Sequence, residues 1–148
     1  MSWDRPNYAI PGLMPESSPV YEATMRINPD GTPYEEHRMD PVLHGDWWEG
    51  ESFNVTYEGG SPGTLAAVRI VLRKGSLEGD AGAEWSADNG LTITDDGAES
   101  GIWSFELTAH NIALEPGDWW GDVECVNTDG QVYTPFTIVL PVLFNGTA

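Results

Sequence analysis

Alternation of apolar and polar residues with a period of two is the dominant pattern in the last third of this chain. It runs through residues 103–109 and again through residues 119–125. Because successive side chains of an extended strand point to opposite faces, the pattern predicts strands with one buried face. Residues 127–130 end in glycine and predict a hairpin turn. A third run follows, and its expected inward face is formed by Val132, Phe136, Ile138, Leu140 and Val142. We expect these three strands to lie side by side and antiparallel in one sheet.

Four shorter strands are expected upstream, each bounded by turn residues. They cover residues 52–57, 65–73, 83–87 and 91–94. About seven short strands separated by turn signals predict an all-β domain, an antiparallel β-sandwich, with a Greek-key barrel as the alternative. Residues 110–114 give the one hint of a helical turn. The expected core includes Trp85, Trp103 and one of Trp119 and Trp120, because a sandwich core is filled from both inner faces.

Residues 1–44 differ from the rest of the chain in composition. They hold seven of the eleven prolines, which fix φ and lack an N–H donor, so the segment cannot be regular sheet throughout. One short strand is expected at residues 20–27. We therefore divide the chain into a proline-rich, ordered, extended N-terminal arm (1–44) and a β-sandwich domain (45–148). The arm is expected to contribute little to the core and to lie along a neighbouring subunit in preference to its own domain. Its expected partner-binding residues are Trp3, Tyr8, Ile10, Leu13, Met14 and Tyr21.

Two tryptophan pairs follow the same Gly-Asp dipeptide, at residues 45–48 and 117–120. Neighbours on a strand point to opposite faces, so one member of each pair must face outward. Trp48 and Trp120 are the expected outward members. Large exposed apolar groups usually mark a protein interface, which makes both residues candidates for partner binding. Stacking of these rings on sugars is the alternative.

The charge balance excludes some partners. Lys and Arg total 6 against 24 Asp and Glu, a formal net charge of −18. Such a field repels phosphate backbones, so nucleic acid is not an expected partner. No apolar run reaches the length of a membrane span, and no signal peptide is recognised, so no membrane contact is expected. The single cysteine, Cys125, has inward parity and is expected to be a small core residue.

Nothing in the sequence marks a catalytic or cofactor site. The three histidines are scattered without metal-ligand spacing, and no glycine-rich elbow presents a nucleophile. Residues 95–96 are two aspartates in an expected exposed turn. Residues 28–30 and 127–129 offer alternating oxygen ligands for Ca²⁺, but Asn and Asp are also the ordinary residues of turns. We therefore predict no enzyme activity, no cofactor and no metal site.

Several short motifs carry a resemblance to a known family. They are Gly45-Asp-Trp, the expected strand at 65–73, Gly101-Ile-Trp-Ser-Phe, Pro116-Gly-Asp-Trp, Gly121-Asp-Val-Glu and Gly130-Gln-Val-Tyr-Thr. In this order they resemble the immunoglobulin-like domains of tailed-bacteriophage virion proteins, in particular the N-terminal domain of baseplate upper proteins. The likeness covers residues 45–144 and leaves the arm unmatched. The long helical or fibrous C-terminal region of many such proteins has no counterpart here, which favours a compact accessory subunit over a receptor fibre.

The resemblance implies an immunoglobulin-like sandwich and a non-enzymatic structural role in the virion. The expected position is the tail, neck or baseplate. The expected partners are other virion structural proteins, in a homo-oligomer or other symmetric assembly. Two alternatives are a capsid decoration protein and a carbohydrate-binding module that uses outward tryptophans.

Overall fold

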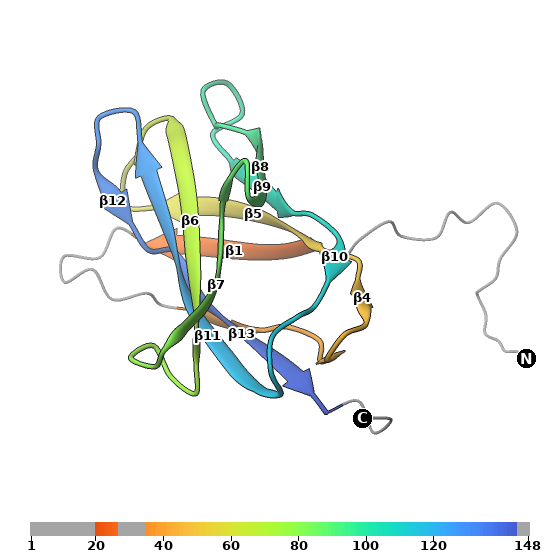
Figure 1. The fold of residues 1–148 in the computed structure, drawn as a ribbon. Helices are drawn as coiled ribbons and strands as arrows, with labels where there is room; N and C mark the ends of the chain where they lie inside the picture. The colour runs from red at the N-terminus through yellow and green to blue at the C-terminus, as the bar shows by residue number, and fades with distance from the viewer. Residues whose placement is uncertain (1–19, 27–34, 145–148) are drawn as a thin grey trace, which may run out of the picture.

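The computed structural model describes residues 20–26 and 35–144 (Figure 1). This part of the chain forms thirteen strands and no helix, which confirms the all-β prediction. The strands are β1 (Val20–Arg26), β2 (Glu35–Arg38), β3 (Val42–Leu43), β4 (Trp47–Trp48), β5 (Glu51–Glu58), β6 (Leu65–Lys74), β7 (Ala81–Ala87), β8 (Gly90–Asp95), β9 (Trp103–Leu107), β10 (His110–Asn111), β11 (Gly117–Asn127), β12 (Val132–Tyr133) and β13 (Phe136–Leu143).

Most of the strands belong to one sheet that curls into a nearly closed barrel (Figure 1). The strand order is β1-β5-β9-β8-β7-β6-β11-β13-β2, with β12 added on β11 and β3 on β13. Strands β10 and β4 form a separate two-stranded sheet. The first and last strands of the order, β1 and β2, face each other across the remaining opening, which we call the seam.

The sheet is mixed, and the prediction of a wholly antiparallel arrangement is wrong. Strand β1 runs parallel to β5, β7 to β8, and β13 to both β2 and β3. A period of two does not distinguish the two cases, because side chains alternate between faces in parallel and antiparallel strands alike. The pattern therefore identifies strands but does not show which strands pair with each other.

The expected order of the last three long strands is only partly right. Strands β11 and β13 form the predicted antiparallel pair, and Gly130 in the turn has a φ of +83°. Strand β9 lies elsewhere, between β5 and β8. The expected helical turn at 110–114 is also wrong: His110 and Asn111 pair with Trp48 and Trp47 of β4.

The arm boundary at residue 44 is wrong for the described residues. Strand β1 pairs along its whole length with β5, and β2 pairs with β13, so both are built into the barrel. Ala23, Met25 and Met39 are buried in the core. This part of the chain therefore lies along its own domain. Residues 1–19, with Trp3, Tyr8, Ile10, Leu13 and Met14, fall outside the described residues, as do residues 27–34 and 145–148.

The core fills the barrel from the inward face of each strand. The predicted members Trp85, Trp103, Trp119 and Cys125 are all buried, and Phe53 stacks on Phe105 with ring centroids 5.4 Å apart. The third apolar run departs from period two. Residues 136–142 of β13 are all buried, so both faces of this strand are covered. Val132 was expected to face inward and is exposed instead.

Candidate docking groove at the seam

A groove of about 480 Å³ lies at one end of the seam. Its walls are the start of β1, His37 of β2, residues 40–43 and residues 46–51. Two segments, residues 20–21 and residues 37–51, therefore meet there, because the sheet curls until its two end strands face each other. This volume suits a few side chains or a small ligand.

A network of polar side chains closes the seam beneath the groove. The Glu35 carboxylate on β2 accepts hydrogen bonds from the Tyr21 hydroxyl at 2.5 Å and from the Thr24 backbone N–H at 2.9 Å. Both donors belong to β1, so one side chain joins the two ends of the sheet without a backbone ladder. A carboxylate is a strong acceptor for such bonds.

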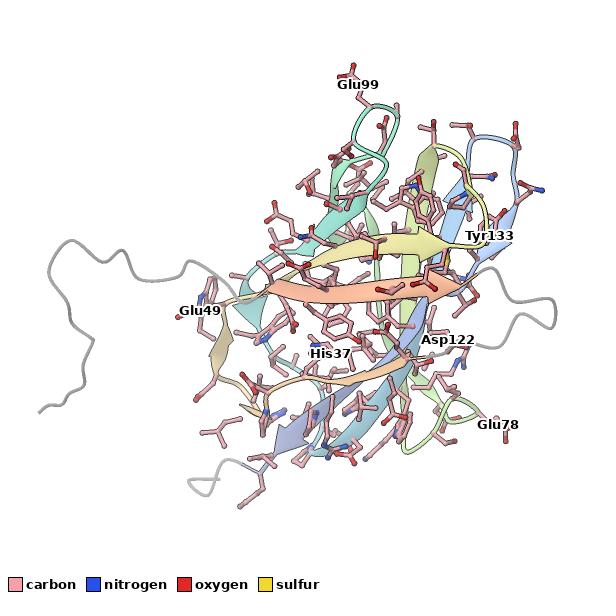
Figure 2. All side chains as sticks on the ribbon, turned by 180° about the vertical axis from the view of Figure 1, so that it is seen from behind. His37, Glu49, Glu78, Glu99, Asp122 and Tyr133 are labelled. Atoms are coloured by element: carbon pink, nitrogen blue, oxygen red, sulfur yellow. The ribbon has the colours of Figure 1, made fainter. Side chains whose placement is uncertain are left out.

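A second pair lies next to this bridge. Nε2 of His37 and Oε2 of Glu51 are 2.6 Å apart, and Glu51 is buried. The Tyr21 ring stacks on the His37 ring with centroids 3.9 Å apart and an interplanar angle of 17°. Figure 2 shows His37 between the two end strands of the sheet. Burial, followed by the hydrogen bond to Glu35, raises the pKa of Tyr21 well above its ordinary value, so its hydroxyl stays a donor.

These polar groups bind one another and thereby hold the seam. In an enzyme, a histidine paired with a carboxylate can act as a general acid or base. Here, however, Nε2 of His37 is held against Glu51, and its ring face is covered by Tyr21. The geometry thus accounts for the cluster as the closure of the barrel and the floor of the groove.

Exposed apolar side chains border the groove on its solvent side. Val20, Leu43 and Trp47 all line it, and Trp47 keeps 62% of its surface exposed. Leu143, which is in register with Leu43 on the neighbouring strand, and Phe144, the residue after it, are exposed as well. We call these five residues the apolar rim. Exposed apolar side chains grouped at a groove usually mark an interaction site.

The groove is also acidic. Asp40, Asp46 and Glu49 line it with exposed side chains, in addition to the buried Glu51. The groove therefore offers an apolar border and negative charge together.

The expected partner-binding residues that the structure describes lie in three different environments. Tyr21 lies in the groove. Trp48 was expected to face outward, but it is only 9% exposed and stacks on Trp85 at 5.5 Å, so that prediction is wrong. The outward member of this pair is Trp47. Trp120 is half-buried on the outer side of β11, as its parity predicts, and does not line the groove.

Sequence reasoning missed the residues that close the seam. Glu35, His37 and Glu51 lie on two strands, and their contacts depend on the sheet curling back on itself. One local signal was present: Glu35 and His37 are two residues apart, so a strand through them puts both on one face. No local pattern links that face to Glu51 or Tyr21.

No cluster of three or more His, Cys, Asp or Glu side chains suited to a metal occurs within residues 20–26 and 35–144. In the loop considered for Ca²⁺, Oδ1 of Asn127 accepts the backbone N–H groups of Asp129 at 3.0 Å and Gln131 at 2.8 Å. That oxygen serves the turn itself. Among the described elements there is also no helix of the length and apolarity that a bilayer crossing requires. Comparisons with family models, curated proteins and solved structures found no significant match to this chain.

Proposed function

We propose that this chain is a non-enzymatic structural subunit of a tailed-bacteriophage virion that docks on neighbouring subunits. The observation that carries the proposal is the apolar rim beside the groove. A lone β-barrel gains nothing from exposing Trp47, Leu43 and Phe144 together, whereas burying them against another subunit is favourable. The rim therefore supports assembly as the role of this end of the barrel.

The virion assignment rests on the resemblance of residues 45–144 to immunoglobulin-like domains of phage virion proteins. Within that proposal the barrel is a variant of the immunoglobulin-like architecture in which β1 and β2 add parallel edges. The proposed position is the tail, neck or baseplate, and the partners are other virion structural proteins. Residues 1–19 are proposed to dock on a neighbour, with Trp3, Tyr8, Ile10, Leu13 and Met14 as anchors.

Negative-stain microscopy of phage particles labelled with an antibody against this protein tests the proposal. We expect label at the tail, neck or baseplate. Label distributed over the capsid lattice would favour the decoration role instead. Particles that carry no label, although the protein is produced during infection, would refute a virion role.

Carbohydrate binding is the second candidate, and one observation favours it. Trp47 presents an exposed ring at the groove, and Asp46 and Glu49 beside it can accept hydrogen bonds from sugar hydroxyls. A glycan array probed with the wild-type protein and with Trp47→Ala tests this reading. Glycan binding that the variant loses would support it, and an array without binding would exclude it for the glycans displayed.

A further inference from the structure

Three acidic side chains of the groove have no partner in the described part of the chain. Asp40, Asp46 and Glu49 line the groove and are exposed. Within residues 20–26 and 35–144, none of the three forms a side-chain hydrogen bond or an ion pair. The fourth acidic lining residue, Glu51, is buried and already paired with His37 at 2.6 Å. The groove therefore carries negative charge that its own walls do not neutralise.

The basic side chains that the structure describes are engaged elsewhere. None of the four lines the groove. The contacts are Arg38 with Asp118 at 3.3 Å, Arg69 with Glu84 at 3.2 Å, Lys74 with Glu115 at 3.2 Å, and Arg73 with the Gly79 carbonyl at 3.2 Å. A cleft lined by charges of one sign concentrates their field and attracts the opposite charge. The groove therefore favours a cation that the described part of the chain does not supply.

An exposed aromatic ring beside these carboxylates narrows the chemistry of that cation. Trp47 lines the groove and keeps 62% of its surface exposed. A cation over the face of a tryptophan is attracted by the ring, and arginine makes this contact more often than lysine. The planar guanidinium of arginine also binds a carboxylate through two parallel hydrogen bonds. One arginine can therefore use both the ring of Trp47 and the carboxylate of Asp46 or Glu49.

We propose that the groove binds an arginine side chain from a basic segment of a different protein. The charge of this chain argues against a second copy, because two molecules with a formal net charge of −18 repel each other. Residues 1–19 bring no net positive charge either, since Arg5 is outnumbered by Asp4 and Glu16. A basic partner is instead attracted by the same field. This inference rests on the proposed function and deepens it by naming the chemistry of the partner.

A peptide probe tests the proposal on the full-length protein. The probe is a dye-labelled Gly-Arg-Ala-Arg-Gly amide, and its matched control carries citrulline, a neutral analogue of arginine, at both positions. Fluorescence anisotropy at low ionic strength should show a dissociation constant about tenfold or more lower for the arginine peptide, which corresponds to about 1.4 kcal/mol. Added salt should weaken this binding, because it screens exposed charges.

Charge reversal locates the binding on the protein. Glu49→Arg should raise the dissociation constant of the arginine peptide about tenfold or more. Glu99→Arg is the matched control: it changes the net charge by the same amount at an exposed residue that does not line the groove (Figure 2). Because charges far from the site are screened, the control should raise the dissociation constant less than about twofold.

Trp47→Ala tests the contribution of the ring. A lysine version of the peptide should bind the wild type more weakly than the arginine version, since the guanidinium also stacks on an aromatic face. The variant should bind the arginine peptide more weakly than the wild type does, and it should show a smaller difference between the two peptides. Far-UV circular dichroism should confirm that each variant is folded.

Three results would overturn the inference. They are equal binding of the arginine and citrulline peptides, equal weakening by Glu49→Arg and Glu99→Arg, and unchanged binding to Trp47→Ala. The second result would mean that the peptide responds to the net charge of the protein and not to the groove. Failure of this inference is distinguishable from failure of the virion proposal. Antibody label on particles without peptide binding refutes the inference alone, and peptide binding without label refutes the virion role alone.

Discussion

Replacing Trp103 with alanine tests the inward face of the barrel most directly. Trp103 lies on β9 and is completely buried, with the rings of Tyr57 and Tyr133 at centroid distances of 5.9 and 6.1 Å. Its Nε1 donates a hydrogen bond to the Gly63 carbonyl at 3.0 Å. The substitution removes both the packing and the bond.

The packing loss dominates the expected effect. Truncating a buried aromatic side chain to alanine costs about 3–5 kcal/mol, since a cavity remains. Gly63 is exposed, so water can replace the lost donor, and the hydrogen bond adds at most about 1 kcal/mol. Because domains of this size are stable by about 5–15 kcal/mol, the variant should be marginally folded. Trp103→Phe keeps most of the packing and should lose only about 1–2 kcal/mol.

Urea denaturation followed by far-UV circular dichroism measures the effect. With a slope of about 2 kcal/mol per M, a loss of about 4 kcal/mol lowers the midpoint by about 2 M. Trp47→Ala is the matched control, the same chemical change at a residue that is 62% exposed, and should change stability by less than about 0.5 kcal/mol. Equal midpoints for Trp103→Ala and the wild type would refute the inward orientation of β9.

Three further predictions follow from the fold. Deleting residues 1–40 removes β1 and β2, so the remaining chain should show no cooperative thermal unfolding by circular dichroism. Deleting residues 1–19 keeps both strands, and that variant should still unfold cooperatively. A folded 1–40 deletion variant would show that the two strands are dispensable. Burial raises the pKa of the Cys125 thiol, so a thiol reagent should label it only after denaturation, and prompt labelling of the native protein would contradict its burial. Burial and Glu35 raise the pKa of Tyr21 in the folded state above the value of 10.0 for the unfolded chain, so Tyr21 contributes stability that is present below about pH 10 and falls as the pH rises further. Urea midpoints measured across this range should fall less steeply for Tyr21→Phe than for the wild type, and equal slopes would contradict the role given to Tyr21.

The sequence alone located the longer strands and most of their inward faces, but it did not predict β2, β3, β4 or β10. The strand pattern places Trp85, Trp103 and one of Trp119 and Trp120 in the core, and Trp85, Trp103 and Trp119 are buried. The turn at Gly130 and the inward parity of Cys125 were also correct. These features are local, because alternation follows from the geometry of one extended strand and a turn from the φ values of a few residues.

The tertiary structure decided which strands are neighbours and therefore which residues form the groove. Four residues form the floor of the groove and the seam, and only Tyr21 among them was expected at a binding surface. Glu35, His37 and Glu51 lie next to Tyr21 because β1 and β2 are the two end strands of one curled sheet. The first tryptophan pair makes the same point. Parity required that one member face outward, but packing against Trp85 decided that Trp48 is buried and Trp47 exposed. Alternation shows only that neighbouring side chains point to opposite faces of a strand. Which of the two faces is buried depends on how the strand packs against the rest of the barrel.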